Sequence, residues 1–177
     1  MEPVYREIKE EEIGFSLFEH FDRSQQVTKC WRRTDGIWTV RNIEFTDDWS
    51  GDDIFRLILQ LKTNAKNGGF VYGAFIKGQL KGFASVDPGF FGTVCRYLDL
   101  SNIFVSRDFR RSGIGKRLFE KSKEWAKYRG ADRLYISAHS AVESQSFYSA
   151  MGCTEAQEYN MALVQKEPCD CQLECTL

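Results

Sequence analysis

The chain has no long apolar run, almost no net charge and only two histidines. No window approaches the about 18 apolar residues that a membrane-spanning helix needs, so we expect no membrane partner. A net charge of −1 provides no overall field that would attract nucleic acid, and we expect no nucleic-acid partner. Residues 1–7 are charged and lack the apolar core of a signal peptide, which predicts a cytoplasmic protein.

Internal repeats, long linkers and low-complexity tracts are also missing from the sequence. A length of 177 residues suits one domain with a single core. The composition, 42% hydrophobic and 14% aromatic, excludes a disordered chain. We therefore expect one domain over residues 1–177.

The six cysteines lack the paired C-x-x-C elements of a zinc site. Three of them, Cys169, Cys171 and Cys175, alternate with polar residues near the C-terminus. This period of two predicts a strand over residues 169–176 with one buried face, where free cysteines act as small hydrophobes. A reducing compartment suits that interpretation, with metal or disulfide chemistry as the alternative.

Apolar spacing predicts the other elements. Side chains recurring about every four residues indicate helices at 10–21, 52–67 and 113–129, and a short helix is expected within 144–152. Runs of strand-forming residues predict strands at 4–8, 39–45, 70–76, 80–86, 97–105, 133–138 and 156–160. Residues 24–50 carry the weakest pattern, with a strand expected only at 39–45.

The segment 103–116 predicts a phosphate-binding turn. An apolar strand end is followed by polar residues and then by glycines at the start of a long amphipathic helix. Helix N-termini offer free N–H groups and partial positive charge, and glycine lets the backbone approach a ligand closely. We expect a phosphorylated cofactor to contact Ile103, Phe104, Val105, Arg110, Arg111, Ser112, Gly113, Ile114, Gly115 and Lys116.

The spacing of this turn excludes two common nucleotide motifs. A Walker A loop would need glycine and Ser or Thr where Arg110 and Arg117 stand, and a Rossmann fingerprint would need glycine at Leu118. What remains, Arg110-x-x-Gly113-x-Gly115, resembles the acetyl-CoA signature Q/R-x-x-G-x-G/A of the GNAT superfamily of N-acetyltransferases. Adjacent arginines can also be plain solvated surface charge, which is the alternative for Arg110 and Arg111.

Two further segments carry the same resemblance. Residues 144–153 are similar to the GNAT pattern A-x-x-F-Y-x-x-x-G-F, with matches at Phe147, Tyr148 and Gly152. The departures are Ser144 and Cys153. Residues 99–105 are similar to the strand E-L-x-x-L-Y-V, with Asp99 in place of glutamate. The resemblance spans roughly residues 70–160 and implies a GNAT α/β fold, with a mixed, mostly antiparallel twisted sheet of about seven strands flanked by about four helices.

The resemblance implies direct transfer of an acyl group from acetyl-CoA to a primary amine. An alkyl amine must lose a proton before it attacks, and the departing thiolate benefits from gaining one, so an acid and a base are wanted. The family pattern places Tyr148 near the thioester sulfur as the acid, the alternative being a tyrosine that packs beside Phe147. Asp99 takes the position of the base, with a water relay as the alternative.

The acceptor site is the least specified part. We expect its walls among Cys30, Trp31, Arg32, Arg33, Trp38, Phe90 and Phe91, with Asp47, Asp48 and Asp87 as acidic groups suited to a cationic amine and His139 as a further candidate. The overall pattern is similar to bacterial small-molecule acetyltransferases, including streptothricin acetyltransferase relatives. The alternative function is a non-catalytic acyl-CoA-binding sensor, and the sequence leaves open both the acceptor and a homodimer.

Overall fold

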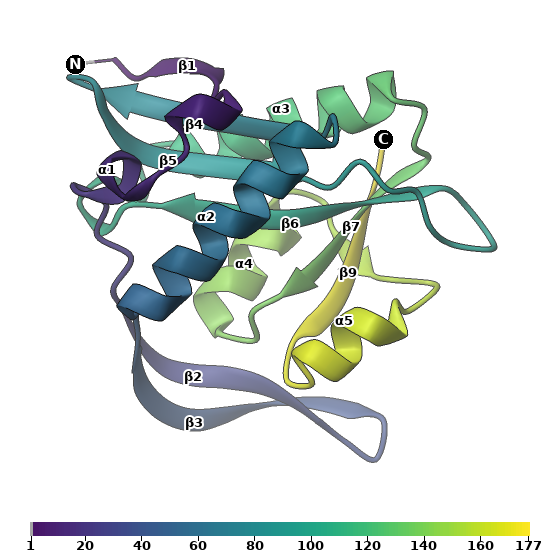
Figure 1. Ribbon diagram of the computed structural model, residues 1–177. Coiled ribbons are helices and arrows are strands. Elements are labelled where there is room, and N and C mark those ends of the chain that lie inside the picture. The colour runs from purple at the N-terminus through teal and green to yellow at the C-terminus, as the bar shows by residue number, and fades with distance from the viewer. Residues whose placement is uncertain (1) are drawn as a thin grey trace.

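Figure 1 shows a computed structural model of the protein, which describes residues 2–177. Seven strands form the main sheet in the order β1-β4-β5-β6-β7-β9-β8, and two more form the separate ribbon β2-β3. The strands are β1 (Val4–Glu7), β2 (Gln25–Thr34), β3 (Ile37–Asp47), β4 (Phe70–Ile76), β5 (Gln79–Val86), β6 (Tyr97–Val105), β7 (Arg133–Ala138), β8 (Thr154–Glu155) and β9 (Cys171–Thr176). The α-helices are α1 (Phe15–Phe18), α2 (Gly51–Lys66), α3 (Ile114–Tyr128), α4 (Val142–Ala150) and α5 (Met161–Lys166). The predicted α/β fold is confirmed, since a mixed and mostly antiparallel sheet lies between helices.

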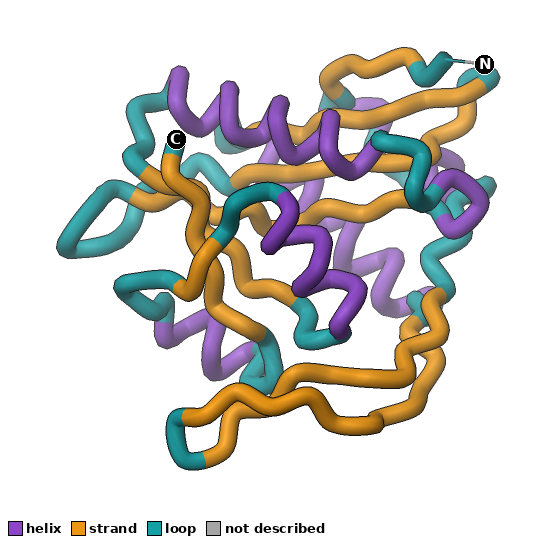
Figure 2. The backbone as a smooth tube through the Cα atoms, turned by 180° about the vertical axis from the view of Figure 1, so that it is seen from behind, coloured by secondary structure: helices purple, strands orange, loops and turns teal. Residues whose placement is uncertain are grey.

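Helices cover both faces of the main sheet. On one face α2 packs its apolar stripe against β4 and β5, burying Leu57, Ile58 and Leu61 beside Phe83. On the other face α3 packs against β4, β5 and β6, and the views from front and back place α2 and α3 on opposite sides (Figures 1 and 2). Because the sheet is buried on both sides, its strands read as apolar runs in the sequence.

The sheet separates between β6 and β7. These two strands pair in parallel over three residues only, Tyr97–Asp99 against Arg133–Tyr135. Beyond Asp99, β6 continues alongside β5 to Val105, whereas β7 continues alongside β9 to Ala138. The two strands therefore splay apart from this point onward.

The predicted helix over residues 10–21 is wrong. A 3₁₀ turn, Glu10–Glu12, and the short helix α1 are separated by Gly14, whose backbone is extended at φ −165° and ψ 178°. Ile13, Leu17, Phe18 and Phe21 still pack on the α2-side core. Their spacing reflects a shared core rather than one helix, and glycine favours the break because it is a poor helix former.

Residues 24–50 form a long hairpin of which only part was expected. Strand β2 was missed, and β3 extends well beyond the expected 39–45. Asp35 and Gly36 form the turn with φ of +52° and +80°, the conformation that Asp-Gly favours in two-residue hairpins. In both views the hairpin lies at one end of the main sheet (Figures 1 and 2).

The C-terminal region corrects two further expectations. The predicted strand 156–160 is wrong, because β8 ends at Glu155 and Asn160 then caps α5, its Oδ1 accepting from the N–H groups of Ala162 and Leu163. Strand β9 is confirmed, but both of its faces are buried rather than one. Its polar face carries Gln172 and Glu174, which accept hydrogen bonds from tyrosine hydroxyls at 2.6 and 2.5 Å.

The structure also bears on membrane-spanning helices, metal ligands and disulfides within residues 2–177. Every helix within residues 2–177 is too short or too polar to span a bilayer. In the same residues no three His, Cys, Asp or Glu side chains gather in a way that would hold a metal ion. All six cysteines are free thiols.

Candidate active site

The turn between β6 and α3 presents a row of backbone N–H groups. Gly113 is the N-cap of α3 at φ +88°, and Arg111 has φ +64°. Alternation of left-handed and right-handed residues makes a concave cradle for anions. Within the described part of the chain, no group accepts a hydrogen bond from the N–H groups of residues 111–116. The turn therefore has the donors that a diphosphate requires.

Arg110 braces this turn from inside. Its Nε donates to the carbonyl of Val105 at 3.2 Å, and its Nη2 donates to the carbonyl of Arg23 at 2.9 Å. Burial and the neighbouring Arg23 guanidinium lower the pKa of Arg110. Its side chain therefore fixes where β6 ends and how the turn departs.

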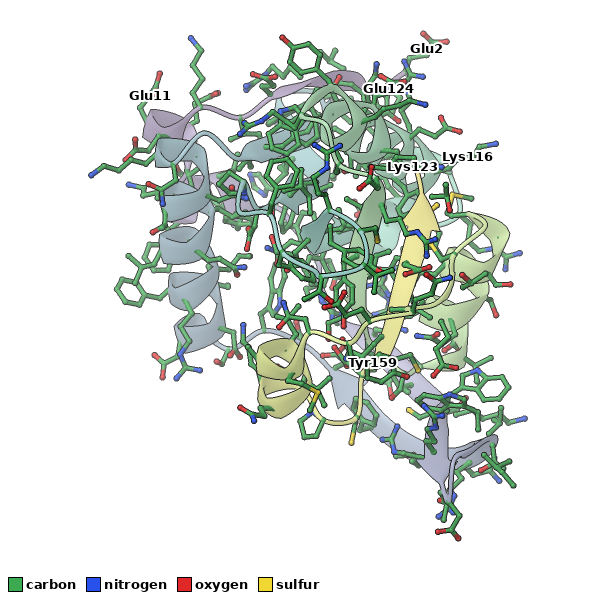
Figure 3. The ribbon with its side chains drawn as sticks, turned by 90° about the vertical axis from the view of Figure 1, so that its right-hand side faces the viewer. Glu2, Glu11, Lys116, Lys123, Glu124 and Tyr159 are labelled. Atoms are coloured by element: carbon green, nitrogen blue, oxygen red, sulfur yellow. The ribbon has the colours of Figure 1, made fainter. Side chains whose placement is uncertain are left out.

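The other polar residues of the turn face solvent. Arg111 and Lys116 are exposed, and Figure 3 shows Lys116 at the surface of α3. The Ser112 hydroxyl donates to the carbonyl of Phe109 at 2.5 Å and closes the turn. Contact between these residues and a phosphate stays a prediction.

The strand residues expected at the cofactor divide between the two faces of β6. Ile103 and Val105 pack on the α3 side, whereas Phe104 packs on the α2 side against Trp49, with ring centroids 5.0 Å apart. Ile114 is buried in the core. Phe104 and Ile114 can therefore contact a ligand in the gap through their backbone only.

Gly115 joins the turn to α4. A Cβ at this position would lie 3.3 Å from Cε2 of Phe147 and 3.6 Å from Cγ2 of Val105. Helix α3 thus approaches α4 closely because residue 115 has no side chain. The two sequence motifs that resemble the GNAT pattern are packed against each other at this contact.

Asp99 lies where β6 and β7 separate, and its Oδ1 is buried without a hydrogen-bond partner. Burial, followed by the charge of Asp87, raises the pKa of Asp99 to about 7, while Lys166 of α5 opposes the rise. An unpaired carboxylate is costly to bury, so the group favours its neutral form. Asp99 is therefore poised to gain or lose a proton near neutral pH.

Asp87 contacts Asp99 through the backbone. Its N–H donates to the carbonyl of Asp99 at 2.9 Å, and its carboxylate accepts from the Ser101 hydroxyl at 2.9 Å. Burial raises the pKa of Asp87 as well. Two carboxyl groups close together resist simultaneous ionisation, so the charge of Asp87 raises the proton affinity of Asp99.

Tyr148 lies on α4 and is 8% exposed. Its ring makes an edge contact with Phe147 at 5.2 Å between centroids. Burial is the largest cause of its raised pKa, with smaller effects of Cys153, Asp170 and Asp99. The phenol therefore keeps its proton at neutral pH and lies within electrostatic reach of Asp99.

The expected acceptor walls fall in separate places. Trp31 and Trp38 line a cavity of about 290 Å³ together with Gln145, Glu155, Cys171, Gln172 and Leu173. Phe91 instead stacks on Tyr97 at 5.3 Å, in the core rather than on a cleft wall. Cys30 is fully buried, Arg32 donates to the Ser140 hydroxyl, and Arg33 pairs with Glu155. Phe90 is exposed, as is Asp48, whereas Asp47 pairs with Arg23 at 2.5 Å.

Two titratable groups stand at the far end of β7. Asp170 accepts from the Ser137 hydroxyl at 3.2 Å, and burial raises its pKa to about 6. The Nδ1 of His139 accepts from the N–H of Ala141, and burial lowers its pKa. Asp170 was missed because its polar alternation in the sequence suggests a solvent-facing residue. Only the pairing of β9 with β7 places it beside Ser137.

Several solved structures share this fold. One is a nourseothricin acetyltransferase, 20% identical with a TM-score of 0.71, covering 98% of this chain and 96% of that one. A putative streptothricin acetyltransferase from Bacillus anthracis, in complex with acetyl coenzyme A, is 17% identical with a TM-score of 0.70, covering 100% and 99%. The PaiA N-acetyltransferase from Thermoplasma acidophilum, in complex with coenzyme A, is 14% identical with a TM-score of 0.59 over the full length of both chains.

The comparison with curated proteins found no match. The family comparison did, since residues 34–153 match the acetyltransferase (GNAT) family. That match spans more than half of the chain and includes the turn before α3, Asp99 and Tyr148. The chain therefore belongs to the GNAT family of acetyltransferases.

Proposed function

We propose that this protein transfers an acetyl group from acetyl-CoA to a primary amine of a small-molecule acceptor by direct attack. The observation that carries the proposal is the buried, unpartnered Oδ1 of Asp99 at the point where β6 and β7 separate. Complexes of the similar structures with acetyl coenzyme A and coenzyme A support the donor. All six cysteines are free, which supports a cytoplasmic location.

The free N–H groups of residues 111–116 would hold the diphosphate of the donor. The acyl arm would then run from this turn into the gap between β6 and β7. There the backbone of β6 past Asp99 offers hydrogen-bonding groups that β7 leaves unpaired. This path would end between Asp99 and Tyr148.

Asp99 would act as the base in this arrangement. A general base works best with a pKa near the operating pH, and the pKa of Asp99 is raised to about 7. Its carboxylate would take a proton from the acceptor ammonium, directly or through one water molecule. The resulting neutral amine then attacks the thioester carbonyl carbon.

Tyr148 would act as the acid on the other side of the gap. Because burial raises its pKa, the phenol is protonated at neutral pH and can donate to the departing thiolate. Collapse of the tetrahedral intermediate breaks the C–S bond and gives the amide product and CoA. The two groups have opposite proton tasks because their environments differ.

A cationic acceptor fits the charge of the site. Asp87, Asp99 and Asp170 are all carboxyl groups with raised proton affinity, and a nearby ammonium would relieve this by stabilising their charged forms. An acidic acceptor would meet repulsion there. A small amine is therefore favoured over an anionic substrate.

The test is release of free CoA from acetyl-CoA in the presence of polyamines, aminoglycosides, streptothricin and short peptides. We expect turnover with at least one small amine and a fall of about 10²- to 10⁴-fold in Asp99→Asn, the usual range for a positioned base. A protein that binds acetyl-CoA but acetylates none of these amines would instead be the non-catalytic sensor.

A further inference from the structure

Two thiols that the acetyl-transfer chemistry does not use lie opposite each other at the edge of the sheet. Strand β8 pairs with β9 in the register Thr154 to Glu174 and Glu155 to Leu173. One step further along the same register places Cys153 opposite Cys175. Both are free cysteines.

The register also fixes how close the two side chains come. The N–H of Ala156 donates to the carbonyl of Gln172 at 2.9 Å, which marks this as a hydrogen-bonded position of the antiparallel pair. Such positions alternate with narrower ones, at which Cα atoms are about 4.5 Å apart and side chains are closer. Counting from Gln172, Cys175 and its partner Cys153 fall at a narrow position. A disulfide fits that separation with a small adjustment.

The surroundings of Cys175 make its thiol easier to ionise. A hydrogen bond from Cys153 and the charge of Lys123 lower the pKa of Cys175 to about 6. Figure 3 shows Lys123 of α3 beside the end of β9. In contrast, burial raises the pKa of Cys171, on the same strand, to about 12. The thiolate is the reactive form, and the pair combines a buried thiol of lowered pKa, Cys175, with a partly exposed thiol, Cys153.

We propose that Cys153 and Cys175 are a reversible modification site, converted by a hydroperoxide into a disulfide. The thiolate of one of the two cysteines attacks the peroxide, forming an S–O bond as the O–O bond breaks and the leaving oxygen takes a proton. The sulfur of the other cysteine then displaces hydroxide from this sulfenic acid, forming the S–S bond, and its proton leaves with hydroxide as water. Two electrons pass from the two sulfurs to the peroxide.

The disulfide would also affect the position of Tyr148, the acid of the proposed reaction. The N–H of Cys153 donates to the carbonyl of Tyr148 at 3.0 Å, and Sγ of Cys175 lies 3.7 Å from the carbonyl oxygen of Met151, just past α4. Drawing the two sulfurs together shifts the chain that ends α4, and with it the Tyr148 ring. This consequence for turnover rests on the proposed function, whereas formation of the disulfide does not.

The test is thiol counting by alkylation and intact mass after treatment with hydrogen peroxide. Cys169→Ser serves as the parent, because Cys169 is exposed and its own oxidation would confuse the thiol count. We expect the parent to lose two alkylatable thiols and regain both with dithiothreitol. Adding Cys153→Ser or Cys175→Ser to the parent should abolish the paired loss, while adding Cys171→Ser, the matched control on β9, should leave it.

Tryptic mapping should join the peptide that contains Cys153 to the one that contains Cys175. Retention of all thiols in the parent, or a crosslink between other cysteines, would overturn the proposal. If circular dichroism shows that Cys175→Ser folds poorly, the thiol count of Cys153→Ser, next to the edge strand β8, decides whether the pair forms the disulfide. CoA release should fall on oxidation and recover on reduction in the parent and in the Cys171→Ser control, and should not respond in the Cys153→Ser or Cys175→Ser variants. A crosslink that forms without changing turnover would overturn the coupling to Tyr148.

Discussion

At the scale of single residues, the charge of Asp87 affects the pKa of Asp99 and thereby the pH dependence of turnover. Asp87→Asn removes a negative charge that raises the pKa of Asp99. The acid limb of kcat/KM should therefore move to lower pH. The pH–rate profile measures this shift directly.

Asp48→Asn is the control for that profile, since Asp48 is exposed and is not among the groups that raise the pKa of Asp99. Its acid limb should stay where it is in the unchanged protein. An acid limb that does not move in Asp87→Asn would mean that a group other than Asp99 titrates in the rate.

Asp99 should also cost the protein stability at neutral pH. Its folded pKa of about 7 exceeds the value of about 3.9 in an unfolded chain, so the folded state binds more protons between these values. Stability is then lost as pH rises through this window. Asp99→Asn should raise the free energy of unfolding by roughly 2–4 kcal/mol at pH 8, the gain shrinking toward pH 4.

Urea unfolding at several pH values measures this gain. An equal gain at pH 4 and pH 8 would contradict it, because a neutral amide would then be better packed rather than spared ionisation. A variant that is more stable and less active is expected where a buried acid is kept for chemistry.

Tyr148→Phe separates catalysis from packing. The change removes only the hydroxyl, so the ring contacts with Phe147 and Phe119 remain. Turnover should fall about 10²- to 10⁴-fold if the phenol assists thiolate departure, while acetyl-CoA affinity stays near that of the unchanged protein. Steady-state kinetics and calorimetry give the two values. Near-normal turnover would mean that the thiolate leaves without this proton.

At the scale of elements, the turn before α3 depends on backbone conformation. Gly113→Val places a branched side chain at φ +88°, which strains the turn that orients the free N–H groups. Acetyl-CoA affinity should fall at least tenfold with the fold retained, as measured by calorimetry and circular dichroism. Gly78→Val is the matched control, since Gly78 has φ +77° and equal open space in the hairpin turn of β4 and β5. Equal affinity losses in both variants would remove the turn from the binding site.

The elements that could be predicted from the sequence are those whose pattern is set locally. Helix α2 has an apolar stripe and a Ser50 capping box, and β6 runs apolar into its polar turn. Strand β2 failed this test because its residues are mostly polar and its partner β3 shields little of it. The only local signal for β2 was Asp35-Gly36. This pair predicts a hairpin turn only when a strand pattern is recognised on each side of it.

The site divides in the same way. Asp99, Tyr148 and the glycine turn belong to motifs with fixed spacing, so their positions along the chain are enough to select them. The location of Asp170 depends on β9 returning beside β7, and the packing of Phe91 on Tyr97 depends on a loop folding inward. Contacts between residues far apart in sequence have no periodic signal, and only the assembled sheet shows them.

At the scale of the whole molecule, the sheet consists of two parts joined by a short parallel pairing. Strands β1, β4, β5 and β6 form one part, and β7, β9 and β8 form the other. A donor bound in the gap would contact both. Acetyl-CoA should therefore raise the melting temperature and slow amide hydrogen exchange in β6 beyond Asp99 and in the end of β7. Slowed exchange at residues 110–116 alone would place the donor outside the gap.

The separation of β6 from β7 has a consequence for the life of the protein in a cell. Past Asp99 and Tyr135 the two strands no longer pair with each other, so this part of the sheet should open transiently more often when no donor is bound. Local opening of this kind is what proteases act on. The lifetime of the enzyme would then increase with the concentration of acetyl-CoA, so that cells with more acetyl-CoA would contain more of the enzyme.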